Sequence, residues 1–218
     1  MYFRKSMDYF NTMDFDVFIS ALSYLGTLSF AISGFITASK KQLDLFGAFV
    51  IAFVTGLGGW TLRDLLLNTK VGWLSEPNNV YIVIAAVILV YLFKKQFVRL
   101  RKTMFLFDTI GIALFTISGL QVAQQYELNN LYLVLFGVIT ATFGGAIRDI
   151  LCDEIPLIFR REIYATACIL GAVSYLGFEA LGFGLIFKTT LACSIIILIR
   201  TLAVLKNWSI PVVADDSE

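Results

Sequence analysis

One ten-residue stretch occurs twice in this chain, 85 positions apart, and each copy lies inside a segment apolar enough to cross a membrane. The first copy, TGLGGWTLRD, covers 55–64, and the second, TATFGGAIRD, covers 140–149. Each copy combines glycines, which cost a helix about 1 kcal/mol each relative to alanine, with an Arg-Asp pair that lipid disfavours. Because such unfavourable features recur together, we expect them to have a packing or functional role.

The match between the two regions extends beyond this motif without a gap. At the same offset Gly26 corresponds to Gly111, and FAISG at 30–34 corresponds to FTISG at 115–119. We interpret the chain as an internal duplication, and the fold must accommodate both copies.

The apolar segments predict an all-α polytopic membrane protein. The 218 residues are 58% hydrophobic and only 15% charged, with a mean hydropathy of +0.81, whereas soluble domains are about one quarter charged. A span needs about 20 apolar residues. Seven segments meet this requirement, at 16–38, 45–67, 79–98, 105–125, 130–151, 163–181 and 184–204. The short connections predict a single membrane domain over 1–218.

Three spans per copy give the duplication a geometric meaning. An odd number of spans reverses the direction of the second copy, so repeat one (16–98) and repeat two (105–181) are expected to form an inverted 3+3 repeat. A seventh helix at 184–204 and a tail at 205–218 follow. Loop Lys and Arg concentrate on one side, which predicts a cytoplasmic C-terminus and an N-terminus outside. The first apolar segment lacks a small-residue cleavage site and is expected to remain attached.

The glycines near the middle of the second and fifth segments have two interpretations. They could allow close packing of helices, or they could kink and break the helices where a polar pathway passes. We favour kinked helices lining a pathway, because the glycines recur at inverted positions beside charges. The candidate pathway residues are Thr55, Gly56, Gly58, Gly59, Trp60, Arg63, Asp64, Thr140, Phe143, Gly144, Gly145, Arg148 and Asp149.

The Arg-Asp pairs are predicted to lie at opposite ends of this pathway. Successive residues on a helix point about 100° apart, so Arg63 and Asp64 are expected to be poor partners for each other. Helix direction places Arg63 toward the outside and Arg148 toward the cytoplasm, which suits two gates. The alternative is that these residues form structural ion pairs or extend to the membrane surface.

Other polar residues in the apolar segments carry weaker signals. Lys188, near the outer end of the seventh segment, either extends outward or places a charge where it reports voltage and gating. Ser33 and Ser118 occupy matched positions and are interpreted as packing contacts, with a pathway role as the alternative. Asp108 stands where the first copy has Ser23, and an acidic residue there favours a helix N-terminus.

Several classes of function are not expected. The chain has no His, and its three cysteines, Cys152, Cys168 and Cys193, lack the spacing of a metal or redox motif. No nucleophile and base pair, metal cluster or cofactor motif stands out, so we expect no enzyme activity, no metal, no cofactor and no nucleic-acid partner. The basic loop at 94–102 is compatible with anionic lipid headgroups, but we favour the positive-inside bias as its explanation.

The duplicated FAISG and FTISG sequences and the twin glycine-rich segments ending in Arg-Asp resemble the prokaryotic branch of the trimeric intracellular cation (TRIC) channel family. The same group is catalogued as an uncharacterised membrane family and as a putative glycine transporter domain. The resemblance covers roughly 16–205. It implies seven helices in an inner membrane, a homotrimer, and one pore per protomer. Kinked second and fifth helices would line that pore, through which monovalent cations, chiefly potassium, would pass.

The chain departs from the family's Gly-Gly-Gly-x-x-Arg-Asp pattern once in each copy. Trp60 replaces the third glycine of the first copy, and Phe143 replaces the first glycine of the second. A bulky ring facing inward would narrow or gate the pathway. The charges of Arg63 and Arg148 suit a cation pathway only if acidic residues neutralise them, so an ion-coupled transporter of glycine or a similar small zwitterion stays open as the alternative.

Overall fold

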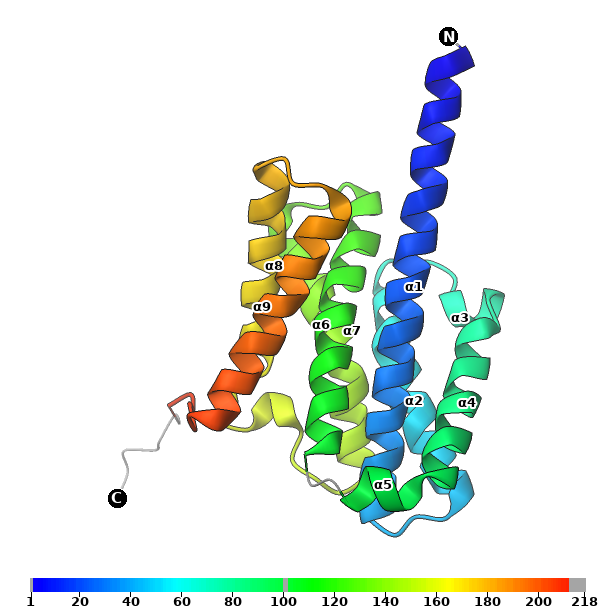
Figure 1. Cartoon of the computed structure of the whole chain (residues 1–218), viewed down its shortest axis with the longest axis vertical. Coiled ribbons are helices and arrows are strands. Elements are labelled where there is room, and N and C mark those ends of the chain that lie inside the picture. Colours follow the sequence, from blue (N-terminus) through cyan, green and yellow to red (C-terminus); the bar gives the residue numbers. More distant parts are fainter. Residues whose placement is uncertain (1, 100–101, 212–218) are drawn as a thin grey trace.

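The computed structural model describes residues 2–99 and 102–211, and within these ranges every regular element is a helix (Figure 1). The α-helices are α1 (Tyr2–Lys40), α2 (Leu45–Leu66), α3 (Gly72–Ser75), α4 (Asn78–Leu92), α5 (Lys94–Arg99), α6 (Thr103–Ala123), α7 (Asn130–Leu151), α8 (Ala165–Ala180) and α9 (Leu185–Leu205). Short 3-10 helices are η1 (Gln124–Tyr126) and η2 (Leu157–Phe159). The predicted all-α class is therefore confirmed.

Among the described residues, five helical segments are long and apolar enough to cross a membrane. They are Val17–Lys40, Leu45–Leu66, Thr103–Tyr126, Asn130–Leu151 and Leu185–Leu205. The helices α4 and α8 are apolar but have only 15 and 16 residues, about 23 Å at 1.5 Å per residue. Seven spans therefore stay a prediction.

The predicted segment 79–98 is too long for one helix. Helix α4 ends at Leu92, and the six-residue α5 follows from Lys94. The break falls where the apolar run meets the first lysines, because charged side chains favour the membrane surface over its interior.

Polar residues at matched positions of the duplication cap the N-termini of α2 and α7. The Asp44 carboxylate accepts a hydrogen bond from the Gly47 N–H at 2.7 Å before α2. The Asn129 side chain, 85 positions later, accepts from the Tyr132 N–H at 3.2 Å before α7. Each side chain satisfies one of the free N–H groups of a first helical turn.

Four helices form the centre of the fold: α1 packs on α2 and α6, and α7 packs on α2 and α6. Helix α4 lies against α1 and α2, whereas α8 and α9 pack together on α6 and α7 at the opposite flank (Figure 1). The rings of Phe30 and Phe115 meet edge to face between α1 and α6, with centroids 5.1 Å apart. These two residues occupy matched positions in the duplication, so the halves meet through equivalent side chains.

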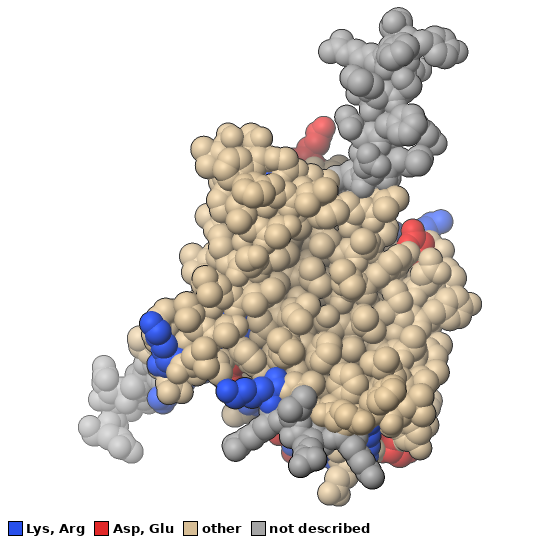
Figure 2. Space-filling view, viewed as in Figure 1, with Lys and Arg blue, Asp and Glu red and all other residues tan. Residues whose placement is uncertain are grey.

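The surface carries its charges mainly near the two ends of the molecule. Figure 2 shows blue and red residues toward the top and the bottom, with a broad uncharged band between them. Exposed large apolar side chains, such as Ile88 on α4 and Leu198 on α9, lie on this surface. This distribution suits a protein whose middle faces lipid.

Candidate functional site

Helices α2 and α7 cross at the two copies of the glycine motif. A Cβ at Gly59 would overlap the Thr140 carbonyl oxygen, and a Cβ at Gly144 would overlap the Thr55 carbonyl oxygen. Gly59 on α2 lies against Thr140 on α7, and Thr55, earlier on α2, lies against Gly144, later on α7. The two helices therefore run antiparallel. The crossing leaves no room for even a methyl group at either glycine, which supports the close-packing interpretation.

Both helices continue through their glycines. Residues 45–66 and 130–151 are each one α-helix, so a kink or break stays a prediction. The hydroxyls of Thr55 and Thr140 donate hydrogen bonds to the carbonyl oxygens of Ile51 and Phe136, both at 2.6 Å. These hydroxyls are therefore satisfied within their own helices.

The remaining glycines of the motif contact different neighbours. A Cβ at Gly56 would lie 3.3 Å from the Thr27 carbonyl oxygen, and one at Gly58 would lie 3.3 Å from Ile147 Cδ1. A Cβ at Gly145 would lie 2.9 Å from the Tyr164 hydroxyl. The glycines thus bring α2 against α1 and α7, and α7 against the residue that precedes α8.

The two aromatic substitutions lie in different environments. Trp60 is buried and its ring centroid is 6.3 Å from that of Phe115. Phe143 is 39% exposed at the surface of the single chain. Of the two rings, only Trp60 therefore lies within the interior of one protomer.

The expectation that Arg63 and Asp64 are poor partners is wrong. The guanidinium Nε and Nη2 donate to Asp64 Oδ1 at 2.9 and 2.7 Å, and both side chains are buried. The long arginine side chain folds back over its neighbour, which offsets the 100° between their Cβ directions. Asp64 Oδ2 also accepts from the Gly72 N–H at 2.8 Å. The pair thus fixes the loop that follows α2.

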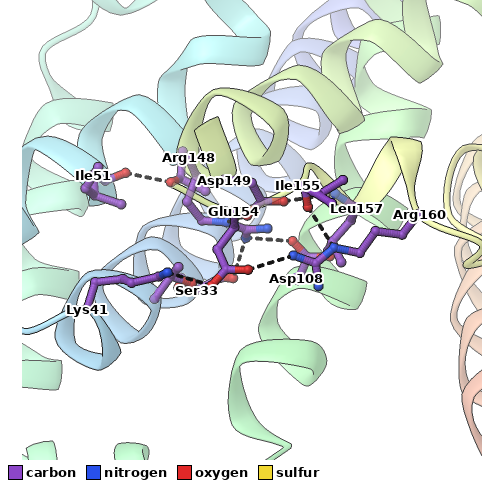
Figure 3. Close-up of polar contacts among 12 residues, drawn as sticks. Ser33, Lys41, Ile51, Asp108, Arg148, Asp149, Glu154, Ile155, Leu157 and Arg160 are labelled. Atoms are coloured by element: carbon purple, nitrogen blue, oxygen red, sulfur yellow. Dashed lines mark hydrogen bonds and ion pairs between the residues drawn. The ribbon is translucent and has the colours of Figure 1, made fainter. Parts of the chain in front are cut away.

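Arg148 forms the same pair and reaches further (Figure 3). Its Nε donates to Asp149 Oδ1 at 2.8 Å, and Asp149 Oδ2 accepts from the Leu157 N–H at 3.0 Å. In addition, Arg148 Nη1 donates to Asp108 Oδ1 at 2.8 Å and to Ser33 Oγ at 2.9 Å. One fully buried guanidinium therefore joins α1, α6 and α7.

Asp108 lies at the centre of this network, a position that the sequence did not predict. Its Oδ2 is 3.3 Å from Arg200 Nη2, and both residues are buried. The Arg200 guanidinium also lies over the Tyr164 ring at 4.6 Å and the Phe105 ring at 5.1 Å. A signal was available: Asp108 has no charged counterpart in the first copy, and α9 is the helix outside the duplication. An unmatched charge of each sign predicts a pair.

A hollow of about 290 Å³ lies at the same end of α7 as Arg148. Charged residues from both copies and from α9 line it, among them Lys40, Lys41, Asp149, Glu154, Arg160 and Arg200.

Glu154 bridges two basic residues at this hollow. Its Oε1 is 2.6 Å from Lys41 Nζ, and its Oε2 is 3.1 Å from Arg160 Nη2 (Figure 3). The Lys41 hydrogen bond and charge lower the pKa of the Glu154 carboxyl, and the same hydrogen bond raises the pKa of Lys41. The bridge joins the loop after α1 to the loop after α7.

Lys188 is paired. Its Nζ donates to Glu179 and lies 4.6 Å from the centre of the Tyr175 ring. The Tyr175 hydroxyl accepts from Gln121 Nε2 at 3.0 Å, which links α6, α8 and α9. Glu179 thus compensates the charge of Lys188, while a voltage or gating role stays a prediction.

The chain matches a family model described as "Glycine transporter" twice, over residues 20–95 and 105–180. The two matches begin 85 positions apart, at the offset of the duplication.

Curated relatives are membrane proteins. A UPF0126 membrane protein of Vibrio cholerae is 34% identical over 216 residues, covering 97% of this chain and 89% of its own length. The UPF0126 inner membrane protein YadS of Escherichia coli is 42% identical over 154 residues, covering 70% of this chain and 74% of its own.

Solved structures with this fold include trimeric intracellular cation channels. One, described in work on conductance through TRIC cation channels, has a TM-score of 0.78 and 34% identity, covering 91% of this chain and 98% of that one. The orthologue from Rhodobacter sphaeroides has a TM-score of 0.80 and 31% identity, covering 87% and 98%.

Proposed function

Because the chain belongs to the prokaryotic TRIC family, whose family model is also described as glycine transporter, we propose that it is a passive channel for monovalent cations. Its structural neighbours are ion channels and not enzymes. The single observation that carries the proposal is the antiparallel α2–α7 pair with a buried Arg-Asp pair in the last turn of each helix. Buried charge at matched, opposite ends suits a pathway through one protomer.

The ion pairs remove the main electrostatic objection to a cation pathway. The carboxylate of Asp64 neutralises Arg63, and Asp149 with Asp108 neutralises Arg148. Compensated arginines repel a passing cation far less than free ones. We therefore propose that the pathway runs through the α2–α7 crossing, with potassium as the principal ion.

The tight contact at Gly59 and Gly144 has a consequence for this pathway. No ion passes between the helices where a methyl group does not fit. Conduction therefore requires the helices to move apart or bend at the glycines, as the predicted kink would allow. Thr55, Gly56, Gly58, Thr140 and Gly145 would then line or flank the opening.

The membrane arrangement completes the proposal. Seven spans, with α4 and α8 as the short ones, would form the inverted 3+3 repeat plus α9. The protein would be a homotrimer in the bacterial inner membrane, with its N-terminus outside and its C-terminus cytoplasmic. The solved relative from Rhodobacter sphaeroides is described as a trimeric cation channel, which supports this assembly.

The experiment is electrical recording from purified protein in a planar bilayer under a potassium gradient, with labelled glycine uptake into liposomes in parallel. Discrete current steps that reverse at the potassium equilibrium potential, without saturable uptake, are the expected result. Saturable glycine uptake without unitary currents would replace the channel by a transporter, the activity that the family model's description names.

A further inference from the structure

The two copies of the motif make equivalent local contacts. Thr55 and Thr140 each bond to a carbonyl four residues earlier at the same distance, 2.6 Å. Asp64 and Asp149 each accept from the backbone N–H eight residues later, at 2.8 and 3.0 Å. A contact that is present in one copy and missing in the other is therefore informative.

One hydrogen bond between the halves breaks this equivalence. Arg148 Nη1 on α7 donates to Ser33 Oγ on α1 at 2.9 Å. The matched residues are Arg63 on α2 and Ser118 on α6. Within the described residues, Arg63 Nη1 and Ser118 Oγ are both buried and both without a hydrogen-bond partner. An unpaired buried donor or acceptor raises the free energy of the folded state. A hydrogen bond between Arg63 Nη1 and Ser118 Oγ would remove this cost for both atoms.

Two residues explain the difference: Asp108, which accepts from Arg148 Nη1 at 2.8 Å and has no charged counterpart in the first copy, and Trp60, one turn before Arg63. The Trp60 ring lies 5.3 Å from the Arg63 guanidinium and 6.3 Å from the Phe115 ring, one turn before Ser118 on α6. At the matched position of the second copy stands Gly145, which has no side chain. No ring blocks the arginine of the second copy, and Asp108 holds its Nη1 where that atom also reaches Ser33 on α1. Arg63 is instead held against a ring.

We propose that the protein has a second conformation in which Arg63 donates to Ser118 while the Arg148–Ser33 bond is broken. In proteins built from inverted repeats, one repeat can rock or gate against the other, and such a movement would change which arginine reaches the serine of the opposite half. In one conformation Ser33 would hold the Arg148 end of the helix bundle together, and in the other Ser118 would hold the Arg63 end. The interpretation of these two ends as gates rests on the proposed channel function. The exchange between the Arg148–Ser33 and Arg63–Ser118 hydrogen bonds does not depend on that function.

The exchange is tested by distance measurements between spin labels. Labels on Lys40 and Leu151, the last residues of α1 and α7 and both exposed, report whether the Arg148 end is held. They are introduced after the native cysteines have been replaced by alanine. The variants are Ser33→Ala and Ser118→Ala, with Ser29→Ala, buried one turn earlier on α1, as the matched control.

Two distance populations are expected, and the two serine variants should shift them in opposite directions. Ser33→Ala should raise the ratio of the long-distance population to the short-distance population about tenfold, and Ser118→Ala should lower this ratio about tenfold. A tenfold change corresponds to the loss of one hydrogen bond to a charged group. Ser29→Ala should leave the ratio unchanged. One population in every variant, or equal shifts for both serines, would overturn the exchange.

Distances need no ion flow, so the two proposals fail separately. Absence of unitary currents from the same preparation would overturn the proposed channel, while opposite shifts in the distance ratio would still establish the exchange.

Discussion

Replacing Gly59 by alanine would place a methyl group against the neighbouring helix. The new Cβ would lie 3.0 Å from the Thr140 carbonyl carbon and would overlap its oxygen, so α2 and α7 would have to separate locally. Such overpacking costs about 1–3 kcal/mol, and alanine returns about 1 kcal/mol of helix propensity. Because each overlap is with a backbone atom, the cost lies at the upper end of this range, and the expected net loss is about 2 kcal/mol. Gly144→Ala should lose a similar amount because its Cβ would overlap the Thr55 carbonyl oxygen.

The matched control is Gly177→Ala on α8, where an added Cβ would meet nothing within 4 Å. This variant keeps the propensity gain without the clash, so its stability should rise or stay unchanged. Thermal unfolding in detergent measures all three variants. If Gly59→Ala melted at or above the wild-type temperature, the helices would already stand apart at the glycines. The close-packing argument would then be wrong.

Three further predictions concern the buried and surface charges. Asp108→Asn leaves two buried guanidinium groups without their shared carboxylate and should lower the free energy of unfolding by about 3–5 kcal/mol, measured in the same melting assay. Because the folded pKa of Glu154 is lowered, its bridge to Lys41 contributes above the ordinary value of 4.5 and is lost as pH falls through the folded value. On acidification the melting temperature of the wild type should therefore fall further than that of Glu154→Gln. Equal decreases in melting temperature for the two proteins would contradict this. Arg63→Gln and Arg148→Gln should each change unitary conductance while gel filtration shows the wild-type oligomer, and loss of the oligomer in both would favour a purely structural role.

The sequence predicted the central helices because their signals are local. The expected segments 45–67 and 130–151 differ from α2 and α7 by at most one residue. An apolar run sets the length of each helix, and a polar capping residue, Asp44 or Asn129, sets its start. The duplication could be found without any structure, and the family model matches twice at its offset.

The ion-pair partners of the buried charged residues could not be predicted from the sequence, for two physical reasons. The helical angle between Arg63 and Asp64 says where their Cβ atoms point, but it ignores the length of the arginine chain, which folds back. Asp108 and Arg200 lie 92 positions apart, and their contact depends on how α6 packs against α9, which periodicity does not give. The glycine crossing was foreseen only as the less favoured of two interpretations, because a sequence does not show which helix faces a glycine.

The position of Arg200 on the last helix has a consequence for the order in which the protein is assembled. Without α9, Asp108 and Asp149 share the single guanidinium of Arg148, so two carboxylates face one positive charge. Arg200 supplies the missing positive charge. Helix α9, which is synthesised after the helices of the second half, would therefore complete the charge balance of those helices.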